Sequence, residues 1–92
     1  MSDGEPWRVE FTSPALRDLD RVPPRYAVAI VEFITSVLPT DPHRLGKPLR
    51  AELEGLHGAR RGDYRVLYRI DAEVRTVFVH RIDHRGRVYQ RR

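Results

Sequence analysis

Arginine is the residue type in this sequence with the clearest capacity for chemistry, and most of the arginines lie in the C-terminal half. Residues 43–92 hold thirteen Lys or Arg against six acidic residues, whereas residues 1–42 hold four Arg against seven acidic residues. A guanidinium group is planar, permanently charged and able to bind a phosphate bidentately. The basic half therefore predicts a polyanionic partner, most simply a nucleic acid. The alternative is a basic surface that contacts only solvent.

Six of the arginines fall in segments that we predict to be neighbouring strands and the turn after them: Arg60, Arg61, Arg65, Arg69, Arg81 and Arg85. Because side chains alternate along a strand, Arg65 and Arg69 share one face. That face is positive and exposed if helices cover the other one. Surface ion pairs with nearby acidic residues contribute only ~0–1 kcal/mol each, and the arginines outnumber those acids, which favours phosphate binding. Tyr89 offers a ring that can stack on a base of single-stranded RNA.

Other chemistries lack the residues that they need. No cysteine is present, which excludes a thiol nucleophile, a Cys-ligated zinc site and an iron–sulfur site. Glycine-rich nucleotide-binding motifs are absent, and the four histidines lack the spacing of metal ligands. We therefore expect no metal and no cofactor. With no signal peptide visible and no apolar run long enough to span a bilayer, we expect a cytoplasmic protein without membrane association.

The N-terminal half predicts one strand and two helices. Residues 7–11 alternate apolar and polar side chains, as a half-buried strand does. Ser13 and the proline after it are typical of a helix start, with Ser13 as the N-cap. Pro23 and Pro24 interrupt that helix and can open a second one, which Pro39 ends. Apolar residues recur at helical spacing in both segments, and so short a joint predicts an antiparallel helical hairpin.

The C-terminal half predicts mainly strands. Residues 39–50 form a proline-rich connector, and residues 51–58 fit either a helical turn or the start of a strand. Three strands are then expected, at residues 59–61, 64–70 and 74–82, with a Gly-Asp hairpin turn between the first two. The order predicts an α+β fold in one domain over residues 1–92. In this fold an N-terminal strand and an antiparallel helical hairpin accompany a mainly antiparallel sheet of about four strands, on which the hairpin packs.

Four segments, taken in order, resemble one known family. Residues 62–70 resemble the GxYRxxY strand of the RelE/ParE toxin superfamily, and residues 83–89 resemble its C-terminal HRxxVY signature. Residues 44–49 and 59–62 are similar to the RelE-type branch in particular. The helical hairpin with its paired prolines fits as well, so the resemblance covers residues 7–90.

The resemblance implies a RelE-like α+β fold and a toxin of a type II toxin–antitoxin pair. The implied activity is that of a metal-independent endoribonuclease, an mRNA interferase that cuts mRNA in the ribosomal A site by attack of the ribose 2′-hydroxyl. The implied partners are a RelB-like antitoxin, the ribosome and mRNA, and operator DNA that the toxin–antitoxin complex binds through the antitoxin. Two alternatives stay open: a ParE-like toxin that inhibits DNA gyrase by binding, without ribonuclease activity, and an inactive toxin that acts as a corepressor with its antitoxin.

The resemblance also implies roles for single residues. Arg65 is expected to clamp the phosphate, Arg85 to stabilise the transition state or donate a proton, and Tyr89 to stack on or orient a base. A second group is expected to bind RNA and phosphate around them: Arg60, Arg61, Lys47, Arg69 and Arg81.

The general base is the least determined of these roles. Some relatives place Lys on the strand before the Tyr-Arg motif, where this chain has Arg60 and Arg61, and a guanidinium is a poor proton acceptor. His84 is the leading candidate because an imidazole titrates near neutral pH. His57 and Glu54 are the alternatives, and a structural hydrogen bond is the competing role for His84.

Overall fold

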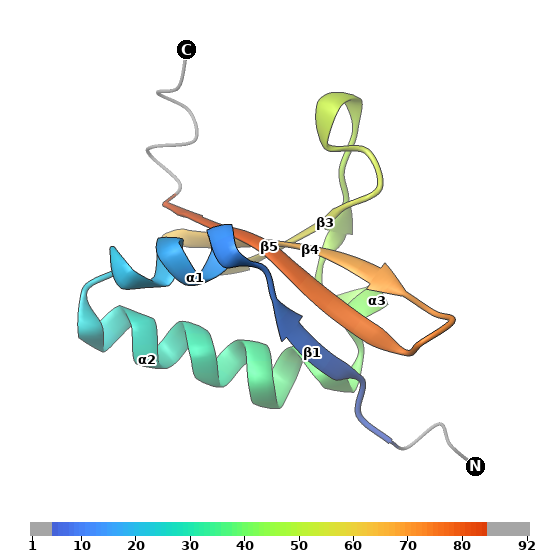
Figure 1. Cartoon of the computed structure of the whole chain (residues 1–92), viewed down its shortest axis with the longest axis horizontal. Coiled ribbons are helices and arrows are strands. Elements are labelled where there is room, and N and C mark those ends of the chain that lie inside the picture. Colours follow the sequence, from blue (N-terminus) through green and yellow to red (C-terminus); the bar gives the residue numbers. More distant parts are fainter. Residues whose placement is uncertain (1–4, 85–92) are drawn as a thin grey trace.

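Five strands form a single mixed sheet in the order β1-β5-β4-β3-β2 (Figure 1). The computed structural model describes residues 5–84. The strands are β1 (Arg8–Phe11), β2 (Lys47–Pro48), β3 (His57–Arg61), β4 (Tyr64–Asp71) and β5 (Thr76–His84). β1 runs parallel to β5, and the other neighbouring pairs are antiparallel. The expected α+β fold is confirmed, and the sheet has one strand more than expected because β2 adds a short edge.

The helical hairpin packs on one side of this sheet, as Figure 1 shows. It consists of α1 (Ser13–Asp20) and α2 (Pro24–Glu32). The chain then continues from α2 through a π-helical turn at Phe33–Val37 and a 3₁₀ turn at Leu38–Thr40. Two short elements follow within the connector and the loop after it: α3 (Pro42–Leu45) and a 3₁₀ turn at Ala51–Leu53. Within residues 5–84, no helix has both the length and the hydropathy to cross a membrane.

The first helix begins one residue earlier than the sequence suggests. The prediction that Ser13 is the N-cap was wrong, because Thr12 fills that position in an extended conformation. The Thr12 hydroxyl oxygen accepts a hydrogen bond from the Ala15 N–H (3.3 Å), which satisfies one of the free donors of the first turn. The same hydroxyl donates to the carbonyl oxygen of His80 on β5 (3.1 Å). Thr12 therefore caps α1 and also joins it to the sheet.

The hydrophobic core lies between the helical hairpin and one face of the sheet. Its fully buried members come from both layers: Ala15, Ile30, Ile34, Leu38, Ala59, Val66, Tyr68, Val77 and Val79. Burying an aliphatic or aromatic side chain of this size contributes about 1.5–3 kcal/mol. The helical stripes that the sequence predicts are therefore core, and they fix which face of the sheet the helices cover.

Tyr68 ties the connector to the sheet. Its hydroxyl donates a hydrogen bond to the Pro42 carbonyl oxygen (2.6 Å). Burial, aided by the charge of Asp41, raises the pKa of Tyr68 to about 12, so the phenol stays protonated as a donor. Gly46 lies so close to this hydroxyl that a Cβ at that position would collide with it. Residues 39–50 are thus held against β4 by one buried hydrogen bond and one close backbone approach.

Several strand boundaries and one strand interior differ from the sequence prediction. β3 begins at His57, two residues early. β5 begins at Thr76, because residues 72–75 form the turn before it, and ends at His84, two residues late. β1 begins and β4 ends one residue later than predicted. Between Leu67 and Tyr68 the register with β5 shifts by one residue, so that His80 is an extra residue in β5. This bulge lets Val79 and Ile82 both reach the core, although strict alternation would separate them.

Candidate nucleic-acid interface

Cationic side chains gather on the sheet face that the helical hairpin leaves uncovered, which we call the open face. Ala59 and Val66 point into the core, so their neighbours along β3 and β4 point the other way. Partners in register share a face. The cations that this rule places on the open face are Arg8 on β1, Lys47 on β2, Arg60 on β3, Arg65 and Arg69 on β4, and Arg81 on β5. The structure therefore brings together five of the residues that the sequence predicts to bind RNA or phosphate.

Arg65 is the most central of these cations. It is paired in register with Arg60 on one side and with Asp83 on the other. Its Cδ lies 3.5 Å from where a Cβ on Gly58 would be, so its aliphatic stem runs across that glycine. Within residues 5–84, Arg65 forms no ion pair, and its buried Nε has no hydrogen-bond partner. A guanidinium that no acidic side chain neutralises keeps its full charge, which makes it a suitable receptor for an anionic oxygen from outside.

Arg81 is already neutralised by an acidic residue. Its Nε and Nη2 donate to the two carboxylate oxygens of Asp18 on α1, at 2.8 and 3.2 Å. The same carboxylate accepts the Ile82 N–H (2.9 Å). Burial alone would raise the pKa of Asp18, but the hydrogen bonds from Arg81 and Ile82 and the charge of Arg81 lower it overall. Asp18 thus provides a hydrogen-bond acceptor for the Ile82 N–H on the edge of β5, beyond the end of β1. The same carboxylate holds the Arg81 guanidinium.

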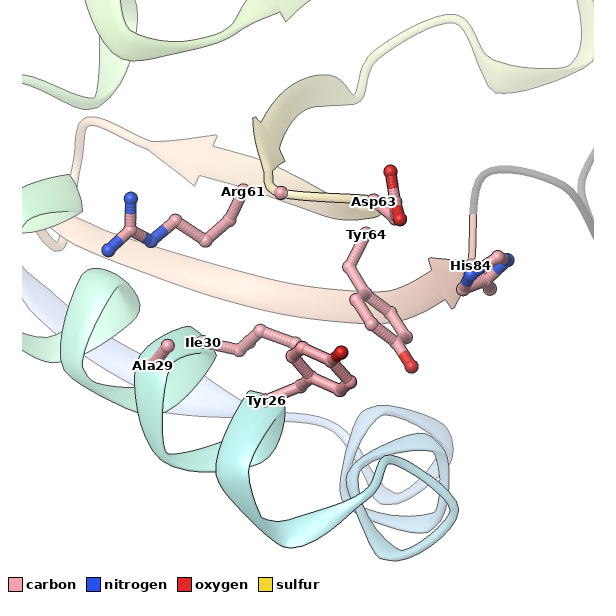
Figure 2. A pocket seen from close by; sticks show the side chains of 8 residues that line it. Tyr26, Ala29, Ile30, Arg61, Asp63, Tyr64 and His84 are labelled. Atoms are coloured by element: carbon pink, nitrogen blue, oxygen red, sulfur yellow. The ribbon is translucent and has the colours of Figure 1, made fainter.

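Arg60 and Arg61 are separated by the pleat of β3. Arg60 shares the open face with Arg65, whereas Arg61 is the partner of Tyr64 and faces the helices. There Arg61 lines a cavity of about 350 Å³ between α2 and the β3–β4 turn (Figure 2). The cavity is bounded by Tyr26, Ala29, Ile30, Arg61, Gly62, Asp63, Tyr64 and His84. The structure does not bring Arg61 together with the cations of the open face.

His84 lies on the cavity side of the sheet. It is the register partner of Tyr64, and the two rings meet edge to face with centroids 5.0 Å apart. Figure 2 shows Tyr64 extending from the strand toward Tyr26 on α2, with His84 at the end of β5. Because Arg65 points to the open face, the leading candidate for the general base and the central cation lie on opposite sides of the sheet.

The alternative bases lie on other elements than Arg65. His57 stacks on Tyr68 on the helix side, with ring centroids 5.6 Å apart, and burial together with the charge of His43 lowers its pKa. Glu54 lies in the loop between β2 and β3, which projects beyond the sheet in Figure 1. Arg85 and Tyr89 lie outside the described residues.

His80 is a titratable residue near the open face that sequence reasoning missed. It is the extra residue of the β5 bulge, and burial together with the charge of Arg69 lowers its pKa. The one signal in the sequence is that the apolar residues of β5 fall at 77, 79 and 82, which breaks the period of two. In the described part of the chain, no three His, Asp or Glu side chains come together as metal ligands.

Comparison with known proteins agrees with this architecture. Residues 9–89 match the family described as the ParE toxin of the type II toxin–antitoxin system parDE. Toxin RelG of Mycobacterium tuberculosis is 54% identical over 86 residues, which are 94% of this chain and 99% of that protein. Toxin RelE of the same organism is 52% identical over 90 residues, covering 98% of this chain and 93% of that protein.

A solved structure gives the same result in three dimensions. The toxin–antitoxin complex RelBE2 of Mycobacterium tuberculosis contains a chain that is 54% identical to this one, with a TM-score of 0.84. The match covers 88% of this chain and 93% of that chain. The chain therefore belongs to the RelE/ParE family of toxins from type II toxin–antitoxin systems.

Proposed function

We propose that this protein is a toxin that cuts mRNA on the ribosome, in the A site, and thereby inhibits translation. The observation that carries the proposal is the guanidinium of Arg65, which forms no ion pair within residues 5–84 and lies at the centre of the cationic sheet face that the helical hairpin leaves uncovered. Two mycobacterial relatives with more than half of their residues in common carry the names RelG and RelE. Family membership and the charge of the open face together favour RNA as the substrate.

The proposed reaction is attack of the ribose 2′-hydroxyl on the adjacent phosphate, which leaves a 2′,3′-cyclic phosphate and a 5′-hydroxyl. Negative charge on the phosphate grows in the transition state, and preorganised cations stabilise that charge. Arg65 contacts the phosphate in this proposal, and Arg60 beside it and Lys47 on β2 hold the neighbouring backbone. The motif assigns transition-state stabilisation to Arg85 and base stacking to Tyr89. Because the cations supply the charge stabilisation, the proposed reaction is metal-independent.

The geometry of the site explains why cleavage would depend on the ribosome. His84 and His57 lie on the helix side of the sheet, opposite Arg65. In this proposal the open face therefore contributes charge stabilisation rather than proton abstraction. In-line attack also requires a bent RNA held in one geometry, which can lower the barrier by several kcal/mol. We propose that the decoding site supplies this positioning and that free mRNA is therefore a poor substrate.

The proposed partner in the resting cell is a RelB-like antitoxin. The related mycobacterial structure is of a toxin–antitoxin complex, and this chain carries a net charge of +4 with its excess in the basic half. An acidic or amphipathic segment that folds on binding can cover such a surface. We further propose that the complex binds operator DNA through the antitoxin and that the toxin acts in the cytoplasm, where its ribosomal target is.

The test uses purified ribosomes stalled on a defined mRNA with an empty A site. The proposal predicts cuts within the A-site codon and none in free mRNA, with 5′-hydroxyl ends mapped by primer extension. A folded protein that leaves the mRNA intact contradicts it.

A second function, inhibition of DNA gyrase by binding, is retained because the matching family takes its description from ParE of parDE. Gyrase supercoiling is measured with the same preparation. Inhibition of supercoiling without mRNA cleavage would establish this second function and make the open face a binding surface only.

A further inference from the structure

A guanidinium stacked on an aromatic ring lies on the open face, at the end of the sheet away from the β3–β4 turn. Arg69 on β4 and Phe78 on β5 are partners in register. The guanidinium carbon of Arg69 lies 4.7 Å from the centroid of the Phe78 ring. Its Nη1 forms an ion pair with Asp71 at 3.5 Å. An aromatic ring beneath the guanidinium and a carboxylate at its edge together restrict the orientation of this planar group.

The opposite side of the guanidinium is accessible. The Arg69 side chain is 45% exposed although it rests on Phe78. A flat cation held in this way is a surface on which a nucleobase stacks, as arginine planes do in complexes with unpaired RNA.

The local charge favours a base over a phosphate at this position. Asp71 offsets the charge of Arg69. Glu10 on β1 is exposed and is the register partner of Phe78 on its other side. A phosphate bound here would be repelled by the Asp71 carboxylate that already pairs with Arg69, whereas a neutral base would not. The sequence prediction grouped Arg69 with the phosphate-binding residues, and the structure gives it different neighbours from those of Arg65.

The position relative to Arg65 suits a neighbouring nucleotide. Arg69 is four residues beyond Arg65 on the same strand and the same face, which corresponds to about 13 Å along the sheet. That distance is too long for one phosphate to reach both guanidinium groups. A strand of RNA bound at Arg65 and running along β4 would bring an adjacent nucleotide over Arg69.

We propose that Arg69, supported by Phe78, is a stacking subsite for one base of the mRNA next to the nucleotide that is cut. Arg69 contacts the base, and Phe78 and Asp71 are positioning residues that hold its plane. This inference rests on the proposed ribonuclease function and adds a contact that makes cleavage dependent on a flanking base.

The experiment measures cleavage on stalled ribosomes with mRNAs that carry a single abasic nucleotide at each position around the cut. For the wild-type protein, an abasic nucleotide at one position should raise KM roughly tenfold and leave kcat within a few-fold. Arg69→Ala should raise KM by the same factor on intact mRNA, and the two changes together should raise it no further. Arg69→Lys should behave like Arg69→Ala, because it keeps the charge but loses the plane.

Arg25→Ala is the matched control. Arg25 also lies over an aromatic ring, with its guanidinium carbon 4.9 Å from the centroid of Tyr26, but on α2 rather than on the open face. The KM of the Arg25→Ala protein should equal that of the wild-type protein. Phe78→Leu provides a second variant, with a smaller rise in KM than Arg69→Ala. Thermal unfolding of each variant checks that the fold is kept.

Three results would overturn the inference. The first is an unchanged KM for Arg69→Ala, and the second is a wild-type KM for Arg69→Lys. The third is that Arg69→Ala and the abasic nucleotide raise KM independently of each other at every position tested. The last result would mean that Arg69 contacts something other than an mRNA base, such as ribosomal RNA. Failure of the proposed function is distinguishable, because then the wild-type protein itself would not cut the A-site codon, and the inference would fall with it.

Discussion

Replacing Asp18 by Asn should destabilise the fold strongly, although the change removes only one charge. Asp18 is 7% exposed, and its carboxylate accepts hydrogen bonds from Arg81 Nε, Arg81 Nη2 and the Ile82 N–H. An amide has one oxygen and one NH₂ group, so Asp18→Asn would point donors at a guanidinium or leave the Ile82 N–H unpaired. In either orientation the junction between α1 and the edge of β5 loses one of its two acceptor oxygens and gains an NH₂ group that faces a donor.

The expected loss in free energy of unfolding can be estimated from these contacts. A hydrogen bond to a charged group contributes about 1.5–3 kcal/mol. The Arg81 side chain is 49% exposed, so solvent screens its share, and we discount the ion pair accordingly. The total is about 2–3 kcal/mol. For a domain of this size each kcal/mol lowers Tm by roughly 4–8 °C, which gives a fall of roughly 10–20 °C.

The assay is urea denaturation of wild type and Asp18→Asn at several pH values. Because the pKa of Asp18 is lowered in the fold from its ordinary 3.8, its contribution is fully present above about pH 5 and is lost as the pH falls through the folded pKa. The difference between the two proteins should therefore be constant near neutral pH and shrink in acid.

Arg44→Gln is the control for this experiment, because its ion pair with Asp41 is long (3.9 Å) and exposed, and it should change stability by less than about 0.5 kcal/mol. A midpoint for Asp18→Asn equal to that of the wild type at pH 7 would refute the reasoning.

Three further predictions concern Tyr68, Gly46 and His57. Tyr68→Phe should lower the free energy of unfolding by about 1–1.5 kcal/mol in urea titrations, because the Pro42 carbonyl loses its buried donor; equal midpoints would show that this hydrogen bond contributes nothing. Gly46→Ala should destabilise the wild type by about 1–3 kcal/mol through collision with the Tyr68 hydroxyl and cost less in the Tyr68→Phe background; equal losses in both backgrounds would place the strain elsewhere. Stability should fall as the pH drops below 6.5, because burial lowers the pKa of His57 in the fold and protonation then favours the unfolded chain. His57→Gln should reduce that fall between pH 7.5 and pH 5, and an unchanged pH dependence would exclude His57 as its cause.

Much of the fold was predictable because it depends on local periodicity. Alternation located β4, helical spacing located both helices of the hairpin, and together they placed Arg65 on the uncovered face. β2 was missed because two residues, Lys47 and Pro48, are too few to show a period. Thr12 was passed over as a cap because Ser13 is an equally good cap residue in sequence, and only the end of β1 decides between them.

The site was less predictable because it depends on contacts distant in sequence. Asp18 and Arg81 are 63 residues apart, and nothing local in either segment indicates their pairing. The β5 bulge at His80 changes which side chains follow it on each face. His84 was predicted to be the general base because an imidazole titrates near neutral pH, yet its register with Tyr64 places it on the cavity side of the sheet, away from Arg65. Strand pairing, rather than composition, determines which of these residues meet.

The central claim is that Arg65 stabilises the phosphate during cleavage, and single-turnover cleavage of ribosome-bound mRNA tests it most directly. Arg65→Gln should lower the cleavage rate by about 10²–10³-fold while leaving thermal unfolding near that of the wild type. Arg17→Gln, which removes the same charge from an exposed position on α1, should cut at the wild-type rate. An Arg65→Gln protein that cuts as fast as the wild type would contradict the account.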